Sequence, residues 1–138
     1  MAFPTTVRLF LYLLAAALLS LCASHARAEG NPVSRIEAAP RQTGFASWYG
    51  YRHNGRRTAN GEIHDSQLLT AAHRGLPFGT LVKVTNLKSG TQVMVRINDR
   101  GPYVLGRVID LSEGAARRLG MLADGLAPVS IEVVAPRG

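Results

Sequence analysis

Residues 81–98, LVKVTNLKSGTQVMVRIN, predict a β-hairpin. The first half is rich in residues that favour β-strands, and Lys88-Ser89-Gly90 supplies the turn. In the second half Val93, Val95 and Ile97 alternate with glutamine, methionine and arginine, which is the two-residue period of a strand with one buried face. The hairpin therefore indicates a domain built from β-strands.

Further strand and helix signals lie on both sides of this hairpin. Three more short strands are predicted over residues 45–49, 108–109 and 129–134. Ser112 is expected to cap a short helix over residues 113–119, which Gly120 ends. Five or six short strands are too few for a large sandwich, and closing them into a barrel removes unpaired edges. We therefore predict an all-β fold, a small β-barrel with one short helix.

The composition of the whole chain is that of a globular protein. It has 138 residues, of which 46% are hydrophobic and 18% charged, and this excludes a disordered tail, a coiled coil and a multi-span membrane protein. The formal net charge is +7, which suits an anionic polymer as partner. The sequence contains no glycine-rich phosphate loop or nucleic-acid motif, so we expect no nucleic-acid partner.

The N-terminus carries the features of a secretory signal peptide over residues 1–28. Arg8 is followed by an apolar run, residues 9–21, and Ala26-Arg27-Ala28 fits a cleavage site. The run is shorter than the roughly 20 residues that cross a bilayer. We therefore expect an exported, periplasmic protein.

Two segments follow the signal peptide. Residues 29–43 are polar, contain two prolines and have no strand or helix period, so we expect a flexible leader before a barrel domain over residues 44–136. The single cysteine, Cys22, would attach the protein to the membrane only if it carried a lipid. Leu21 stands before it where a small residue is usual, so a cleaved, unanchored form is the favoured prediction.

Acidic side chains and imidazoles gather in and just after the irregular segment 50–66. Glu62, His64, Asp65 and His73 lie within twelve positions of one another. These side chain types can bind zinc, but no HExxH or CxxC spacing is present, so we expect no metal. Structural alternatives remain open for two of them: a solvated loop charge for Glu62 and a core position for His73.

Two further aspartates lie at places that suit catalysis. Asp99 directly follows the alternating strand and precedes Arg-Gly-Pro, where glycine and proline fix the loop. Asp110 lies between apolar residues, an unusual setting for a carboxylate. The structural alternatives are an ion pair with a neighbouring arginine for Asp99, and backbone N–H groups at the start of the Ser112 helix for Asp110.

Seven short motifs occur in the order seen in the rare lipoprotein A family, which the chain resembles from Gly44 to about Val134. They are GFASWYG (44–50), RTANGE (57–62), LTAAH (69–73), LPFGT (76–80), VTNL (84–87), NDRGP (98–102) and RVIDLS (107–112). The resemblance implies a six-stranded double-psi β-barrel, a fold shared with expansins. It also implies an endolytic lytic transglycosylase that cleaves peptidoglycan glycan strands, preferentially those without stem peptides, during cell-wall remodelling and daughter-cell separation.

The resemblance further implies which side chains are catalytic. Asp99, Glu62 and His73 match family residues linked to activity, and Asp65 and Asp110 match secondary cleft positions. We expect Asp99 to protonate the bond between N-acetylmuramic acid and N-acetylglucosamine. It would then take the proton of the muramic C6 hydroxyl as a 1,6-anhydro ring closes. Glu62 and His73 would orient sugar hydroxyls and stabilise charge.

The same resemblance suggests how the substrate is bound. The residues expected to bind it are Trp48, Tyr49, Asn60 and Arg100, with the two aromatic rings as a floor for the sugars. His64 and Ser66 stand where an aromatic residue and a methionine are common in the family, so this wall of the cleft is expected to differ. No metal or organic cofactor is required.

Two other functions stay open at this point. The same cleft would serve a non-catalytic, expansin-like module that binds peptidoglycan. A purely structural or partner-binding role with cell-division proteins would instead need an intact barrel with a blocked cleft. We expect a monomer. The chain ends at Gly138 without the C-terminal SPOR module of longer family members, so recruitment to the septum through that module is not expected.

Overall fold

The computed structural model describes residues 40–135 of the chain. The predicted signal peptide, Cys22 and residues 29–39 of the predicted leader lie outside them. The elements in this range are β1 (Arg41–Tyr49), η2 (Tyr51–His53), β2 (Thr70–Ala72), β3 (Leu81–Asn86), β4 (Gln92–Asp99), β5 (Arg107–Ser112), α2 (Glu113–Arg118) and β6 (Ala127–Ala135). Over these residues, neither helix has the length and apolar character needed to cross a bilayer.

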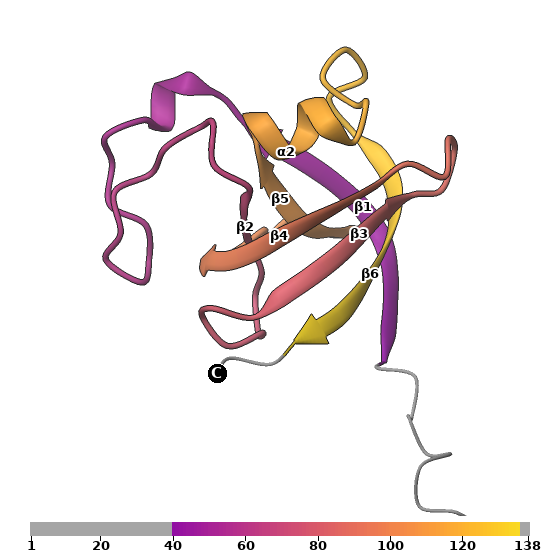
Figure 1. The fold of residues 1–138 in the computed structure, drawn as a ribbon, viewed down its shortest axis with the longest axis horizontal. Coiled ribbons are helices and arrows are strands. Elements are labelled where there is room, and N and C mark those ends of the chain that lie inside the picture. The colour runs from indigo at the N-terminus through magenta and orange to yellow at the C-terminus, as the bar shows by residue number, and fades with distance from the viewer. Residues whose placement is uncertain (1–39, 136–138) are drawn as a thin grey trace, which may run out of the picture. The chain divides into compact units, whose positions relative to one another are not determined.

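The six strands close into a barrel in the order β1-β5-β2-β4-β3-β6, as Figure 1 shows. Strand β1 runs parallel to β5, and β2 runs parallel to β4, whereas the other neighbours are antiparallel. Because each of these six strands has a partner on both sides, none of them leaves an edge open to pair with another chain. The prediction of a small all-β barrel is therefore confirmed.

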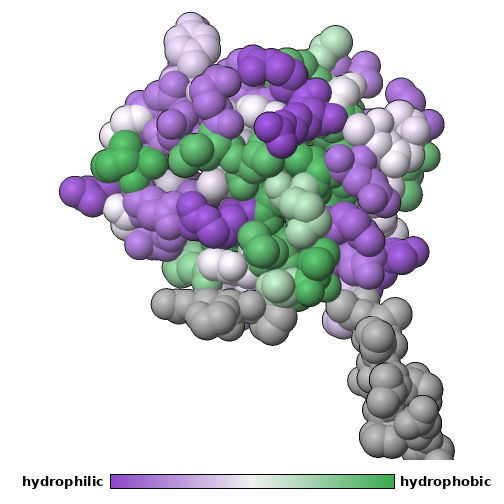
Figure 2. Space-filling view, in the orientation of Figure 1, coloured by the Kyte–Doolittle hydropathy of each residue, from purple (hydrophilic) through white to green (hydrophobic). Residues whose placement is uncertain are grey.

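The predicted hairpin forms the β3–β4 pair. Val93, Val95 and Ile97 are all buried, together with Val82 and Val84 from β3. The predicted alternation is thus correct, and these side chains form much of the barrel core. Figure 2 shows hydrophobic side chains in the middle of the face over these strands, with hydrophilic ones around them.

Strand β5 extends over Arg107–Ser112 where only residues 108–109 were predicted, and two further strands differ from the prediction for a clear reason. Strand β2, which the sequence analysis missed, is only three residues long and wholly buried, so it has no alternation to detect. Strand β1 begins at Arg41, within the predicted leader, because residues 41–46 pair with β6. The tertiary pairing of both segments, not their composition, makes them strands.

The predicted helix is present as α2, and Ser112 caps it by accepting a hydrogen bond from the Ala115 N–H. Its first turn holds the end of the long β1–β2 segment in place. The Gly114 N–H donates to the Ser66 carbonyl at 2.8 Å. A Cβ at Gly114 would lie 2.7 Å from the Gln67 carbonyl oxygen, so only glycine allows this approach.

Candidate active site

The long segment between β1 and β2 projects from one side of the barrel and lies beside the end of β4 (Figure 1, left). It contains few regular elements but many internal hydrogen bonds. The Thr58 N–H donates to the Glu62 carbonyl, and the Ser66 N–H donates to the Asn54 side chain. The Asn60 N–H donates to the Asn98 carbonyl. The segment is therefore attached to the strand that ends in Asp99.

Strand register brings two aspartates into one row. Ala72 in β2 pairs with Asp99 in β4 on one side and with Asp110 in β5 on the other. Asp110 in turn pairs with Ser47 in β1. Paired residues on neighbouring strands project to the same face, and neighbouring strands lie about 4.8 Å apart, so the two aspartate backbones are roughly 10 Å apart. The small Ala72 side chain leaves the space between them open.

A cavity of about 300 Å³ occupies this space. Strand residues and the adjacent turn supply one part of its lining: Tyr49, Ala72, Asp99, Arg100 and Asp110. The projecting segment supplies the other part: His53, Arg56, Arg57, Thr58 and His64. The cavity thus combines two carboxylates with three arginines and aromatic rings.

Two backbone N–H groups hold the Asp99 carboxyl group in place. Its Oδ1 atom accepts hydrogen bonds from the Ala59 N–H and the Arg100 N–H, both at 2.9 Å. These donors fix the direction of the carboxyl group. Because both act on Oδ1, Oδ2 is the oxygen suited to carry a proton and meet a substrate.

Asp110 has a different environment. Its Oδ1 atom accepts hydrogen bonds from the Ser47 hydroxyl and the Arg107 guanidinium. The structural alternative in which Asp110 caps the following helix is wrong, because Ser112 fills that position. The Ser47 and Arg107 contacts hold the Asp110 carboxyl group in place at the wall of the cavity.

Glu62 lies in a neighbouring depression of about 360 Å³, lined by Asn60, Glu62, Phe78, Gly79 and Arg96. Both of its oxygens are used within the chain. Arg96 binds them bidentately at 2.6 and 2.9 Å, and Asn60 and Asn98 donate one hydrogen bond to each oxygen. The Arg96 hydrogen bonds lower the pKa of Glu62 to about 2, so the carboxylate is ionised at neutral pH.

These contacts occupy Glu62 fully. Four donors meet the four lone-pair positions that a carboxylate offers. The Glu62 side chain is 40% exposed, but a sugar hydroxyl could bind it in this conformation only by sharing an acceptor position that is already in use. Its contacts join the projecting segment to β4 next to Asp99.

His73 follows β2 and is buried. Its Nδ1 atom accepts hydrogen bonds from the Gly75 and Leu76 N–H groups at 3.0 Å, so the ring proton lies on Nε2 and is donated to Gln42 Oε1. Burial lowers the pKa of His73, which keeps the ring neutral. The ring contacts the start of β1 and its own turn, while the His73 backbone N–H pairs with Asp99.

The three residues predicted to be catalytic are therefore not collected in one cavity. Asp99 lines the first cavity, Glu62 lines the second depression, and the His73 ring binds backbone groups and Gln42. The segment containing Thr58, Asn60 and Glu62 separates the two openings, because Thr58 lines one and the other two residues line the next.

Three of the remaining predicted site residues lie outside the Asp99 cavity: Asp65, Trp48 and Asn60. Asp65 is exposed and accepts a hydrogen bond from the Gln67 N–H, which stabilises a turn. Trp48 contacts the hydrophobic core and borders a different opening from Tyr49, because successive side chains of a strand point to opposite faces. The predicted floor of two adjacent aromatic rings is thus divided between two places.

Arg100 and Asn60 are held by neighbouring groups. The Arg100 guanidinium donates to the His73 and Leu76 carbonyls and lies 3.8 Å from the centre of the Phe78 ring. Asn60 accepts from the Thr58 hydroxyl and donates to Glu62. Arg100 lines the Asp99 cavity, whereas Asn60 lines the Glu62 depression.

The projecting segment brings five residues into the cavity lining that were not predicted to be catalytic or to bind the substrate: His53, Arg56, Arg57, Thr58 and His64. Thr58 and His64 are the buried ones, and His64 has the more unusual environment. It is 4% exposed, its ring lies 4.7 Å from that of Tyr49, and neither ring nitrogen has a hydrogen-bond partner among residues 40–135. Burial lowers its pKa, so the ring is neutral. The pKa of the buried Tyr49 hydroxyl is raised instead. Burial is the main cause, and the nearby Asp99 and Asp110 carboxylates add to it.

No sequence signal points to the buried position of His64. In Ile63-His64-Asp65-Ser66 the apolar Ile63 is exposed and the polar His64 and Ser66 are buried, which is the reverse of what hydropathy alternation predicts. The zinc-binding residue types of this region do not converge: in the part of the chain that the structure describes, no three potential metal ligands form a group.

The model of a protein family described as lytic transglycolase matches residues 41–131. A probable endolytic peptidoglycan transglycosylase RlpA of Synechocystis is 62% identical over 91 residues, which are 66% of this chain and 28% of that protein. The corresponding protein of Campylobacter jejuni is 55% identical over 91 residues, 66% of this chain and 33% of that protein.

A third relative extends the match along the chain. The probable endolytic peptidoglycan transglycosylase RlpA of Nostoc is 51% identical over 123 residues, which are 83% of this chain and 33% of that protein. The chain thus spans about a third or less of the length of these three relatives.

Solved structures resemble the barrel as well. The Streptomyces papain inhibitor has a TM-score of 0.59 at 23% identity, covering 72% of this chain and 99% of the inhibitor. An expansin of Clavibacter michiganensis has a TM-score of 0.57 at 26% identity, covering 72% of this chain and 53% of the expansin. These likenesses confirm the predicted double-psi β-barrel.

Proposed function

Since the chain belongs to the rare lipoprotein A family of lytic transglycolases, we propose that its barrel cleaves peptidoglycan glycan strands by lytic transglycosylation. The bond cleaved joins N-acetylmuramic acid to N-acetylglucosamine. The observation that carries the proposal is the position of Asp99, whose carboxyl group is fixed by two backbone N–H groups at the wall of an open cavity.

The proposed reaction needs one carboxyl group that gives and recovers a proton. Asp99 protonates the glycosidic oxygen, and the bond between that oxygen and C1 of the muramic residue breaks. The muramic C6 oxygen attacks C1 to close the 1,6-anhydro ring, and its hydroxyl proton passes to the Asp99 carboxylate. No water is consumed, and Asp99 returns to its protonated state.

Asp110 contributes a negative charge to this reaction. Cleavage of a glycosidic bond passes through a state in which positive charge develops on the sugar ring. The Asp110 carboxylate lines the same cavity and is fixed by Ser47 and Arg107. A preorganised charge of opposite sign in the cavity favours that state.

Three arginines around the cavity support a substrate that carries carboxylates. Arg56, Arg57 and Arg100 all line it. A glycan strand without stem peptides exposes the lactyl carboxylate of each muramic residue, and guanidinium groups bind carboxylates through paired hydrogen bonds. We propose such stripped strands as the preferred substrate.

Glu62 and His73 act as positioning residues in this proposal. Glu62 is bound to Arg96 and Asn98 on the strand that ends in Asp99. His73 orders the turn whose carbonyls hold Arg100. Both residues therefore fix the walls of the cavity through other residues and do not contact the sugar.

A peptidoglycan substrate implies a location outside the cytoplasm. We propose the periplasm, after removal of the signal peptide predicted over residues 1–28, with the glycan strand as the principal partner. Attachment through Cys22 and contact with cell-division proteins remain separate hypotheses. A monomer is sufficient for this chemistry, because both aspartates come from one barrel.

An expansin-like binding module is the second candidate. It is supported by the likeness to the Clavibacter expansin, a mutant of which has been crystallised in complex with cellohexaose; that structure has a TM-score of 0.57 at 25% identity. In this case the cavity would hold a glycan without cleaving it.

Analysis of the sugar ends separates the candidates. The purified protein is incubated with sacculi from which the stem peptides have been removed, and the released fragments are identified by mass spectrometry. New 1,6-anhydro ends support lytic transglycosylation. New reducing ends would indicate hydrolysis instead, and binding without any new ends would favour the expansin-like module.

A further inference from the structure

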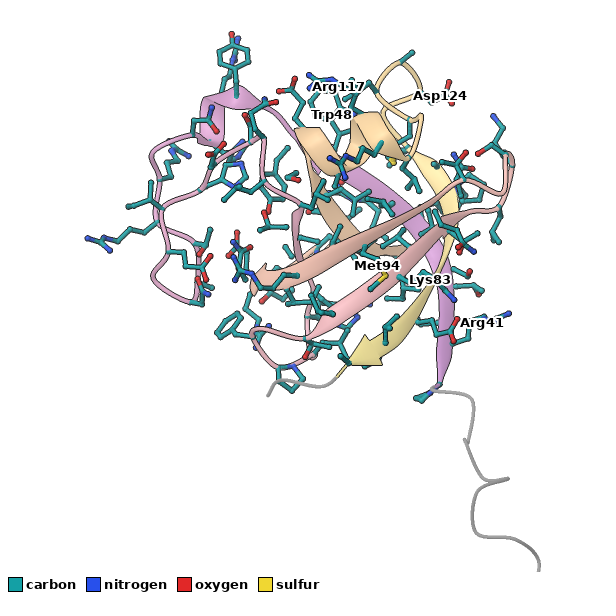
Figure 3. The ribbon with its side chains drawn as sticks, in the orientation of Figure 1. Arg41, Trp48, Lys83, Met94, Arg117 and Asp124 are labelled. Carbon is teal, nitrogen blue, oxygen red and sulfur yellow. The ribbon has the colours of Figure 1, made fainter. Side chains whose placement is uncertain are left out.

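Another opening, different from the Glu62 depression, lies beside the Asp99 cavity and is not used by the reaction described above. Its volume is about 370 Å³, and it is lined by Trp48, Gly50, Tyr51, Arg52, His53 and Glu113. We call it the Trp48 cavity. Figure 3 shows Trp48 beside helix α2, near Arg117.

The two openings are continuous in their lining. His53 borders both of them. Its ring also meets the Tyr49 ring edge to face, with centres 5.4 Å apart. A chain-like molecule that leaves the Asp99 cavity across His53 therefore arrives at the Trp48 cavity.

The indole of Trp48 is kept open by its neighbour. A Cβ at Gly50 would lie 3.2 Å from Trp48 Cζ3, so a side chain at that position would crowd the ring. On the other side of Gly50, the Tyr51 side chain is 69% exposed. Large aromatic side chains that remain open to solvent mark binding surfaces more often than single exposed aliphatic ones.

Polar groups at the same opening suit an uncharged, hydroxyl-rich ligand. Glu113 is fixed by Arg117, which binds its Oε1 atom at 2.6 Å, so Oε2 is directed elsewhere and can accept a hydrogen bond. Arg52 is exposed and offers donors. An aromatic face with one acceptor and one donor nearby matches a pyranose ring, which has an apolar face and hydroxyls at its edge.

We propose that the Trp48 cavity is a second saccharide subsite, which holds a sugar of the same glycan strand across His53 from the bond that Asp99 cleaves. This inference rests on the proposed function, since it takes the glycan strand as the occupant. It assigns Trp48, Tyr51, Arg52 and Glu113 to binding of the strand beyond the reacting residues.

The chain offers a direct reporter, because Trp48 is its only tryptophan. Long peptide-free glycan strands are titrated into the protein, and intrinsic tryptophan fluorescence is followed while calorimetry establishes saturation. We expect a change of emission that saturates with binding. Unchanged emission at saturation would overturn the subsite.

Two exposed residues of the cavity provide variants that leave the core intact. Tyr51→Ala and Arg52→Ala should each weaken binding of long strands by about three- to tenfold, as expected for loss of one aromatic or polar contact. If a single disaccharide binds in the Asp99 cavity, as the proposal requires, its affinity should be unchanged in both variants. Arg118→Ala removes another exposed arginine, away from the opening, and should bind long strands like the parent.

The outcomes also separate this inference from the proposed function. Equal binding of long strands by Tyr51→Ala and the parent would overturn the subsite, and so would an equal loss for the disaccharide. If the parent releases no anhydro ends but binds long strands in a Tyr51-dependent manner, lytic transglycosylation fails and the subsite is supported.

Discussion

Glu62 and Asp99 resemble each other in sequence but differ in how their lone pairs are used. Each lies in a loop-like motif, and each was predicted to be catalytic. In the structure Glu62 receives four side-chain hydrogen bonds, whereas Asp99 receives two backbone hydrogen bonds, both on Oδ1. A saturated carboxylate stabilises its surroundings, and an incompletely bonded carboxylate in a cavity can react. This difference assigns a positioning role to Glu62 and a direct chemical role to Asp99.

The largest effect is expected at Asp99. Asp99→Asn keeps the shape of the side chain and can still accept on Oδ1, but it cannot give and recover a proton. Release of 1,6-anhydro ends should fall by about 10² to 10⁴-fold, which is the usual contribution of a general acid or base. The melting temperature should stay close to that of the parent. Retained release would remove Asp99 from the central role.

A smaller effect is expected at Glu62. Glu62→Gln breaks the charge pair with Arg96 and loosens the segment beside Asp99, so we expect about a tenfold loss of activity and about 1 kcal/mol of stability. Both are measured on one preparation by product release and urea unfolding.

The double variant with Arg96→Gln is the matched control for Glu62. It removes the partner charge as well and should recover part of the lost stability, because no unpaired guanidinium remains. A loss of activity as large as that of Asp99→Asn, without loss of stability, would show that Glu62 takes a direct part in the reaction.

The buried histidines make stability depend on pH. Burial lowers the pKa of His64 and His73, so below the ordinary value of about 6.5 the unfolded chain binds more protons than the folded one. The free energy of unfolding should therefore be highest above that pH and decrease as the pH falls below it. Urea unfolding at several pH values measures this slope.

A variant isolates the contribution of His64. His64→Phe keeps an aromatic ring against Tyr49 but removes the titrating nitrogens, so the slope below about pH 6.5 should become shallower. The hydrophilic groups that face this ring are Tyr49, His53, Asp65 and Asp99. An unchanged slope would assign the pH dependence to His73 and the other groups alone.

The smallest effect is expected at Asp65. It is exposed and only stabilises a local turn, so Asp65→Asn, which keeps the turn acceptor, should change stability by no more than about 0.5 kcal/mol. Activity should be equal to that of the parent within error. A loss of activity comparable to that of Glu62→Gln would mean that Asp65 also contributes to the reaction, although it makes only a local turn contact in the structure.

Much of the fold could be predicted from local patterns. The alternation of Val93, Val95 and Ile97 identified a strand, and Ser112 and Gly120 marked the limits of α2, because these signals depend on neighbours in the chain. Strand β2 could not be found in this way. Its three residues are a strand only because they pair with β4 and β5.

The sequence by itself determined the kinds of chemical groups available: carboxylates, imidazoles and arginines in an all-β domain whose motifs resemble one family. Only the tertiary structure decided which of them share a cavity. Asp99 and Asp110 are eleven positions apart along the chain yet flank Ala72, because strand register, and not sequence distance, sets which side chains are neighbours. It also decided that the Glu62 carboxylate is hydrogen-bonded while the His64 ring has no hydrogen-bond partner among the described residues, since hydrogen bonds between distant segments exist only after the barrel has closed.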